Sequence, residues 1–205
     1  MANVDRPNGF TPAKSLLGAP WQSMIRKYPM GDASADTTGN HGDVYIGDPV
    51  KFSSGEILAA NSGDTIVGVV VGVGDHGGVT HGATGPFNAP SLEQNYIKYS
   101  DTSATSAQDV WIVPVNGVLF EVQTASDLDL VPGSTADITN AANTAHGSRT
   151  TGKSTCELTT SSNVDVSVVE QVTTPDNDVT AANARHLVKF YRPQFAAPDD
   201  AEANP

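Results

Sequence analysis

The sequence predicts a mainly β protein: a β-barrel or β-sandwich body with an extended N-terminal arm and an irregular C-terminal tail. Three observations favour this class. Charged residues make up only 17% of the 205 residues, and small polar and β-branched residues take their place. No segment has a sustained helical period. Residues 65–73 are apolar on both faces of an extended strand, so we expect them to form a central strand covered on both sides.

This central strand has two different faces. Its odd positions share one face and are all β-branched: Thr65, Val67, Val69, Val71 and Val73. The other face is notched by Gly68 and Gly72. Glycine inside a strand usually marks a bulge, a bend, or a place where another backbone comes close. We therefore expect one of these features here.

The rest of the chain divides into three parts. Residues 1–42 read as an extended docking arm and loop, because prolines and glycines alternate there with large apolar side chains. Residues 193–205 read as an acidic, proline-bearing tail. The body spans residues 43–192, and alternating apolar residues predict its other strands: 44–46 with 50–52, 57–60, 96–99, 111–115, 118–123, 156–158, 164–172 and 187–191.

One hairpin can be specified in detail. Asn116-Gly117 is a strong signal for a two-residue type I′ turn. Such a turn pairs Val115 with Val118, and the next pairs on that face are Val113 with Phe120 and Trp111 with Val122. Pro114 has no donor for a ladder, so it indicates an edge or a bulge.

Charge and cysteine content exclude several functions. The net charge is −12, which disfavours direct binding of nucleic acid. Residues 1–30 carry four basic residues and one acidic residue, a charge of +3, so the remainder carries −15. The single Cys156 cannot form an intrachain disulfide and reads as a buried apolar residue. No membrane-spanning or secretory segment is visible, and we expect synthesis in the cytoplasm.

Residues 147–154 match the phosphate-loop pattern GxxxxGK[ST]. In that motif, backbone N–H groups cradle phosphates, Lys153 would neutralise them and Ser154 would hold magnesium. A phosphate loop follows a buried strand and opens a helix. Here polar residues precede the motif and a β-like segment follows it, so a polar loop is the favoured interpretation and a nucleotide-binding enzyme the alternative.

The other patterns are weaker indications of a chemical site. Residues 72–77 spell GxGxxG, but no helix follows. His76, His81 and Asp75 lack the further ligands of a metal site, and residues 176–178 favour an Asx turn over a calcium loop. The long loop at residues 74–90 could bind a carbohydrate on cell surfaces. We expect no catalytic residue, no metal and no cofactor.

Short segments along most of the chain carry a family resemblance. They are Met1–Phe10 with Pro12, Pro20–Trp21, Arg26–Tyr28, Gly47–Val50, Ile66–Gly72, Phe120–Gln123, Gly152–Ser154 with Glu157–Leu158, Pro175–Asn177 and Leu187–Val188. In these segments the chain resembles the decoration proteins, also called cement or head-stabilising proteins, that tailed bacteriophages place on their capsids.

The resemblance implies a non-enzymatic virion protein on the outer capsid surface. Such a protein is usually a trimer and clamps neighbouring major capsid subunits together. The expected partners are therefore the major capsid protein and further copies of this chain, with no membrane and no direct nucleic acid. Aromatic and basic residues of the arm are the expected interface residues: Arg6, Phe10, Trp21, Arg26, Lys27 and Tyr28. A tail or head-fibre subunit is the alternative within the virion.

Overall fold

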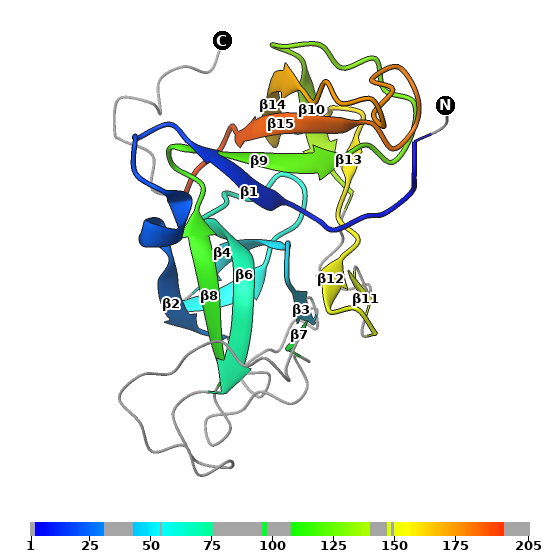
Figure 1. Cartoon of the computed structure of the whole chain (residues 1–205). Helices are drawn as coiled ribbons and strands as arrows, with labels where there is room; N and C mark the ends of the chain where they lie inside the picture. Colours follow the sequence, from blue (N-terminus) through cyan, green and yellow to red (C-terminus); the bar gives the residue numbers. More distant parts are fainter. Residues whose placement is uncertain are drawn as a thin grey trace.

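The computed structural model describes residues 3–30, 43–53, 55–75, 96–97, 108–139, 147–148 and 150–194. Within these ranges the chain is almost entirely β, with fifteen strands and one short 3-10 turn, η1 (Trp21–Met24). The strands form two main antiparallel sheets, one in the upper half and one in the lower half of Figure 1. The predicted mainly β, sandwich-like body is confirmed.

The upper sheet has six strands. In spatial order they are β1 (Thr11–Ser15), β9 (Val118–Gln123), β15 (Arg185–Phe190), β14 (Val166–Gln171), β10 (Thr135–Ile138) and β13 (Leu158–Thr159). Strand β15 shows the expected alternation, with His186, Val188 and Phe190 buried and Lys189 exposed. One face of this sheet is therefore covered by the core.

The lower sheet has five strands. In spatial order they are β2 (Arg26–Pro29), β8 (Gln108–Pro114), β6 (Gly68–Asp75), β4 (Pro49–Ser53) and β5 (Glu56–Ala59). The sheet curls until a single parallel bridge joins Met30, which follows β2, to Ile57 of β5. No strand ladder completes this contact in the described residues, so the barrel is not closed.

Two small ribbons complete the β structure. Strand β3 (Val44–Tyr45) pairs with β7 (Tyr96–Ile97), and β11 (Gly147–Ser148) pairs with β12 (Lys153–Ser154). The rings of Tyr45 and Tyr96 stack with centroids 5.3 Å apart. A Cβ atom at Gly147 would collide with the ring of Tyr45, so glycine lets the second ribbon lie directly on the first.

The central strand is where the sequence places it, between β8 and β4, but its faces differ from the prediction. A bulge between Val70 and Gly72 inserts Val71 as an extra residue opposite β8. Consequently Val69 faces one core cluster, whereas Val70 and Val73 face the other. The expectation of one β-branched face is therefore wrong, because Val67 and Val73 lie in the smaller cluster and Val69 lies in the larger one. The expected close approach occurs at Gly68, where a Cβ atom would lie 2.8 Å from the carbonyl oxygen of Val113.

The predicted hairpin does not form. Strand β8 pairs with β6 and β2, whereas β9 pairs with β1 and β15, so the turn at Asn116-Gly117 carries the chain from one sheet to the other. Pro114 lies at the end of β8 opposite Gly68, where the pairing with β2 has already stopped at Ile112. A turn does form at Asn116-Gly117, but it is not the predicted type I′, because Gly117 has a positive φ and Asn116 does not. A turn also does not specify that the flanking strands pair.

Two hydrophobic clusters stabilise the sheets. The larger cluster lies between the two sheets and contains three aromatic rings, of which Phe10 and Phe190 have centroids 4.9 Å apart, and Phe120 and Phe190 5.6 Å apart. The smaller cluster lies inside the curled five-stranded sheet, around Val50, Ile57 and Ile112. Burial of both clusters supplies the main favourable free energy of folding.

The N-terminal residues belong to both sheets. Strand β1 forms the edge of the six-stranded sheet and β2 forms the edge of the five-stranded sheet. Phe10 enters the core and donates its N–H to the carbonyl of Gly47 at 2.8 Å. Residues 3–30 therefore pack on the body of their own chain, and the prolines and glycines that suggested a free arm mark the turns between its short elements.

The beginning of the predicted tail is also attached to the body. The N–H of Gln194 donates to the carbonyl of Ile66 at 2.8 Å. The side-chain amide of Gln194 bonds to both backbone groups of Phe52, with distances of 2.7 Å from the Phe52 N–H and 3.1 Å to its carbonyl. Residues 195–205 lie outside the described residues.

Candidate functional site

The most distinctive surface is a strip formed by residues 11–29, which we call the N-terminal strip. It runs along β1, η1 and β2, seen in blue in Figure 1. It contains three basic residues, Lys14, Arg26 and Lys27, and no acidic residue, although the chain as a whole carries −12. A positive strip on an acidic protein favours binding to a partner with complementary charge.

The loop between β1 and η1 exposes two leucines. Leu16 is 54% exposed and Leu17 is 68% exposed. The backbone beneath them is fixed, because the Leu16 N–H donates to the carbonyl of Gly117 at 2.7 Å. Gly117 has φ of 74°, and a Cβ atom there would lie 2.7 Å from Cγ of Leu17, so the leucine lies against this glycine. An ordered loop with exposed leucines loses little entropy on binding.

Four of the six residues expected at an interface lie together in this strip. Trp21 is half-buried against the larger core cluster, and Arg26 is exposed, with its guanidinium 3.0 Å from the carbonyl of Ile25. The Lys27 ammonium pairs with the buried carboxylate of Asp109 at 2.9 Å. The ring of Tyr28 meets that of Phe52 edge to face, with centroids 4.8 Å apart.

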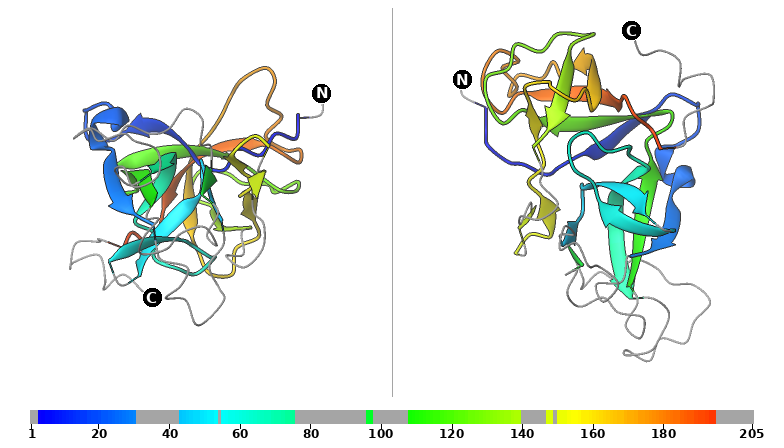
Figure 2. Two further views of the ribbon diagram at one scale, coloured as in Figure 1. Left: turned by 90° about the horizontal axis from the view of Figure 1, so that it is seen from below. Right: turned by 180° about the vertical axis from the view of Figure 1, so that it is seen from behind.

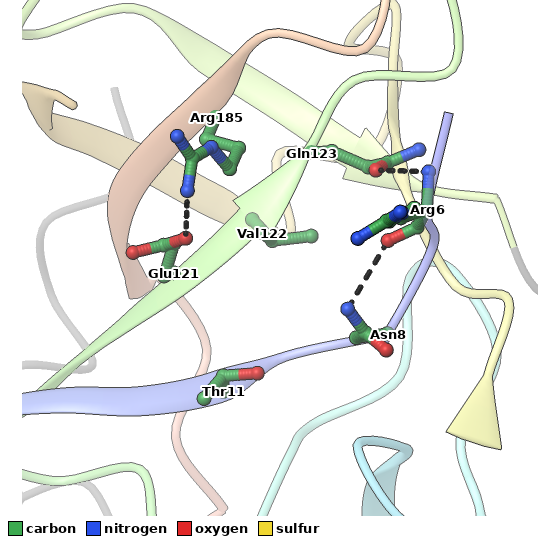
Figure 3. Close-up of a pocket in the computed structure, with 8 residues that line it drawn as sticks. Arg6, Asn8, Thr11, Glu121, Val122, Gln123 and Arg185 are labelled. Atoms are coloured by element: carbon green, nitrogen blue, oxygen red, sulfur yellow. Dashed lines mark hydrogen bonds and ion pairs between the residues drawn. The ribbon is translucent and has the colours of Figure 1, made fainter. Parts of the chain in front are cut away.

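The other two residues lie elsewhere. Phe10 is only 1% exposed, so it stabilises its own chain and cannot reach a partner. Arg6 is exposed and lines a shallow pocket at the other end of β1 (Figure 3). The sequence grouped these residues because they are adjacent in the chain, and the course of the N-terminal segment separates them.

The pocket lies where residues 6–11 cross β9, and it is lined by Arg6, Asn8, Gly9, Thr11, Glu121, Val122, Gln123 and Arg185. The pocket is open, and its volume of about 270 Å³ includes space open to solvent. The guanidinium of Arg185 is already paired with Glu121 at 3.4 Å and with Asp176 at 3.0 Å. These contacts indicate that the residues around the pocket hold the N-terminal segment on the body and do not form a ligand site.

Gln123 connects the N-terminal segment to β9. Its side-chain oxygen accepts the Arg6 N–H at 3.2 Å, and its amide nitrogen donates to Asp5 at 3.2 Å and to Glu157 at 2.5 Å. Burial raises the pKa of Glu157; the hydrogen bond from Gln123 opposes this, and the nearby charge of Asp5 adds to it. The network fixes the entry of the N-terminal segment onto β9.

The phosphate-loop pattern does not form a phosphate cradle. Its ends are the antiparallel strands β11 and β12, in which Ser148 faces Lys153. The Gly152 N–H donates to the Ser148 carbonyl at 2.7 Å, and the Ser154 N–H donates to Ile46 at 2.9 Å. Amides that already have partners cannot bind a phosphate, and no helix begins after the pattern. The pattern is a hairpin in this chain.

The other candidate motifs show no chemical site in the part of the chain that the structure describes. Residues 76–95, with His76 and His81, lie outside the described residues, so the GxGxxG and carbohydrate-loop interpretations are not resolved. The Asx turn is confirmed, because Thr180 donates its N–H to the carboxylate of Asp178 at 3.1 Å. Across the described ranges, no group of three His, Cys, Asp or Glu side chains could hold a metal.

No helix in the described part of the chain has the length and apolar character needed to cross a membrane.

No protein-family model, curated protein or solved structure matches the chain. The N-terminal strip is therefore the surface from which a function can be argued. The sequence identified its aromatic and basic residues but did not single out Leu16 and Leu17, because only the fold determines which leucines are exposed.

Proposed function

We propose that this protein is a non-enzymatic structural component of a bacteriophage virion. It binds the outer surface of the capsid and cements neighbouring major capsid subunits, and it assembles with copies of itself as a trimer. The resemblance to capsid decoration proteins supports this proposal. The localisation that follows is the capsid surface.

The observation that carries the proposal is the N-terminal strip. Arg26 is exposed at the edge of the five-stranded sheet, and no carboxylate in the described residues pairs with its guanidinium. Trp21 lies five residues earlier, at the start of η1, and is half-buried. Arginine and tryptophan are the residues that most often dominate the binding free energy of an interface. A capsid surface with acidic groups around an apolar depression would fit this pair.

The test is co-sedimentation of the purified protein with capsids that lack it. Arg26→Glu is expected to weaken binding about tenfold or more, because it replaces attraction by repulsion at the centre of the contact. Lys189→Glu makes the same charge change at an exposed position of the six-stranded sheet, away from the strip. This control variant should bind like the unmodified protein.

Two results would contradict the proposal. If the unmodified protein does not reach a saturating number of copies per capsid, it is not a decoration protein, and binding to tails is tested next. If Arg26→Glu and Lys189→Glu bind equally well, the strip is not the attachment surface. Raising the salt concentration should weaken a true strip contact, since exposed charges are screened.

A further inference from the structure

A second exposed apolar surface lies at the far end of the six-stranded sheet. Val131, in the loop that connects β9 to β10, is 51% exposed, and Val169, in β14, is 42% exposed. The turn is tied to β14 by two backbone hydrogen bonds of 2.8 Å, from Gly133 to Val168 and from Val168 to Ser134. The backbone around both valines is therefore ordered, and the turn that follows Val131 is held next to the β14 residue that precedes Val169.

Both valines belong to chain segments that are rich in acidic residues. Residues 125–134 and 166–180, which we call the acidic end, contain no lysine or arginine. They contain five acidic residues, all exposed: Asp127, Asp129, Glu170, Asp176 and Asp178. The acidic end thus has the same arrangement as the leucine loop, exposed aliphatic side chains beside charges, with the opposite sign.

The two surfaces face away from each other. In Figure 1 the β1–η1 loop lies at the left and the loops of the acidic end lie at the upper right, and the view from behind in Figure 2 agrees. They cannot meet within one molecule. Complementary surfaces on opposite sides of a chain produce head-to-tail contacts, which close into a ring when the rotation between copies allows it.

We infer that Leu16 and Leu17 of one copy pack against Val131 and Val169 of the next copy. Lys14, which is two residues before Leu16, then faces Glu170 of that neighbour. Apolar contact excludes water at the centre, and the opposite charges set the orientation. The inference rests on the part of the proposed function in which copies assemble, and it does not require a capsid.

The test uses two variants that each remove one side of the contact. Leu16→Ser with Leu17→Ser lacks the leucine loop, and Val131→Ser with Val169→Ser lacks the apolar patch. All four positions are exposed, so both variants should keep the circular dichroism and unfolding transition of the unmodified protein. Molar mass is measured by light scattering after size exclusion at on the order of 100 µM, a concentration that detects weak association.

The unmodified protein is expected to be an oligomer and each variant a monomer. An equimolar mixture of the two variants should form a one-to-one complex, because the intact leucine loop of one fits the intact patch of the other. Lys14→Glu should also dissociate the oligomer, and Lys14→Glu combined with Glu170→Lys should restore it.

A monomeric unmodified protein would overturn the inference, as would variants that assemble like it. Monomers that stay separate on mixing would also overturn it, since they exclude a head-to-tail contact. Capsid binding is a separate measurement that depends on Arg26. Oligomers that bind no capsid therefore refute capsid attachment and leave this inference standing. Monomers that bind capsids refute this inference and the proposed trimer, and they leave capsid attachment standing.

Discussion

Phe10 lies in the larger core cluster, where its ring contacts Phe190 from the last strand. Replacing a buried phenylalanine by alanine removes apolar burial and leaves a cavity. Phe10→Ala should therefore lower the free energy of unfolding by about 3–5 kcal/mol, measured by urea denaturation. The exposed control Leu17→Ala should change it by less than about 1 kcal/mol. Unchanged stability in Phe10→Ala would show that Phe10 does not stabilise the core. It would favour the interface role that the sequence suggested.

His186 is a buried polar residue of a different kind. It is 0% exposed, and neither ring nitrogen has a hydrogen-bond partner in the described residues. Burial lowers the pKa of His186, because the charged ring would lose its hydration. The unfolded chain therefore takes up a proton at a higher pH than the folded protein. Stability should fall as the pH drops below the usual histidine pKa of about 6.5.

His186→Leu should remove this dependence. The variant should be more stable by about 1 kcal/mol at neutral pH, because two unsatisfied nitrogen atoms are removed. Its advantage should grow as the pH falls from about 7.5 to 5, because only the histidine protein loses stability by protonation at this site. Urea midpoints of both proteins across this range measure the difference. Parallel pH profiles would show that His186 finds a proton acceptor.

At the scale of single elements, Asp137 of β10 determines how β13 connects to β14. Its carboxylate is 4% exposed and accepts the N–H groups of Ser162, Asn163 and Val164 at 2.6–3.1 Å. Val164 has φ of 60°, in a region that a β-branched residue rarely adopts. The carboxylate therefore stabilises a turn that the local sequence does not favour.

Asp137→Ala should destabilise the protein by about 3 kcal/mol or more, because three amides lose their acceptor. Asp137→Asn keeps one side-chain oxygen and should cost less. Amide hydrogen exchange offers a local measurement, and it should show faster exchange at residues 162–164 in the alanine variant before global unfolding. Exchange that accelerates equally over the whole chain would contradict a local role.

Element positions could be predicted where a local pattern is strong. The valine-rich run predicts β6, and its glycines predict the bulge and the close approach to β8. The partners of β8 and β9 could not be predicted, because each pairs with a strand from the N-terminal segment and with a strand distant along the chain. Turn chemistry acts over four residues and carries no information on such pairings.

For the whole molecule, the N-terminal segment is a structural part and not a removable arm. It supplies β1, β2 and Phe10. A chain that begins at Gly31 would expose β8 and β9 as unpaired edges and lose part of the core. We expect it to be unfolded or aggregated by circular dichroism and light scattering, even without capsids. A folded, soluble truncation would show that residues 1–30 are an independent arm.

The candidate site was predictable only in part at this scale. Composition alone identifies a basic, aromatic N-terminal segment on an acidic chain. Composition could not show that Arg6 and Arg26 lie at different ends of that segment's path. It also could not show that the turn after Val131 lies beside β14, because this depends on the pairing of β10 with β14. Surfaces made by residues far apart in the sequence require the fold.

The contact between Phe10 and Phe190 also has a consequence for how the chain reaches its native state. Strand β1 can pair only when β9 is present, and the core around Phe10 can close only when β15, the last strand in the sequence, is in place. Folds dominated by such distant pairings form in milliseconds to seconds, far more slowly than helical bundles. During synthesis, residues 3–30 therefore leave the ribosome well before the strands with which they pair.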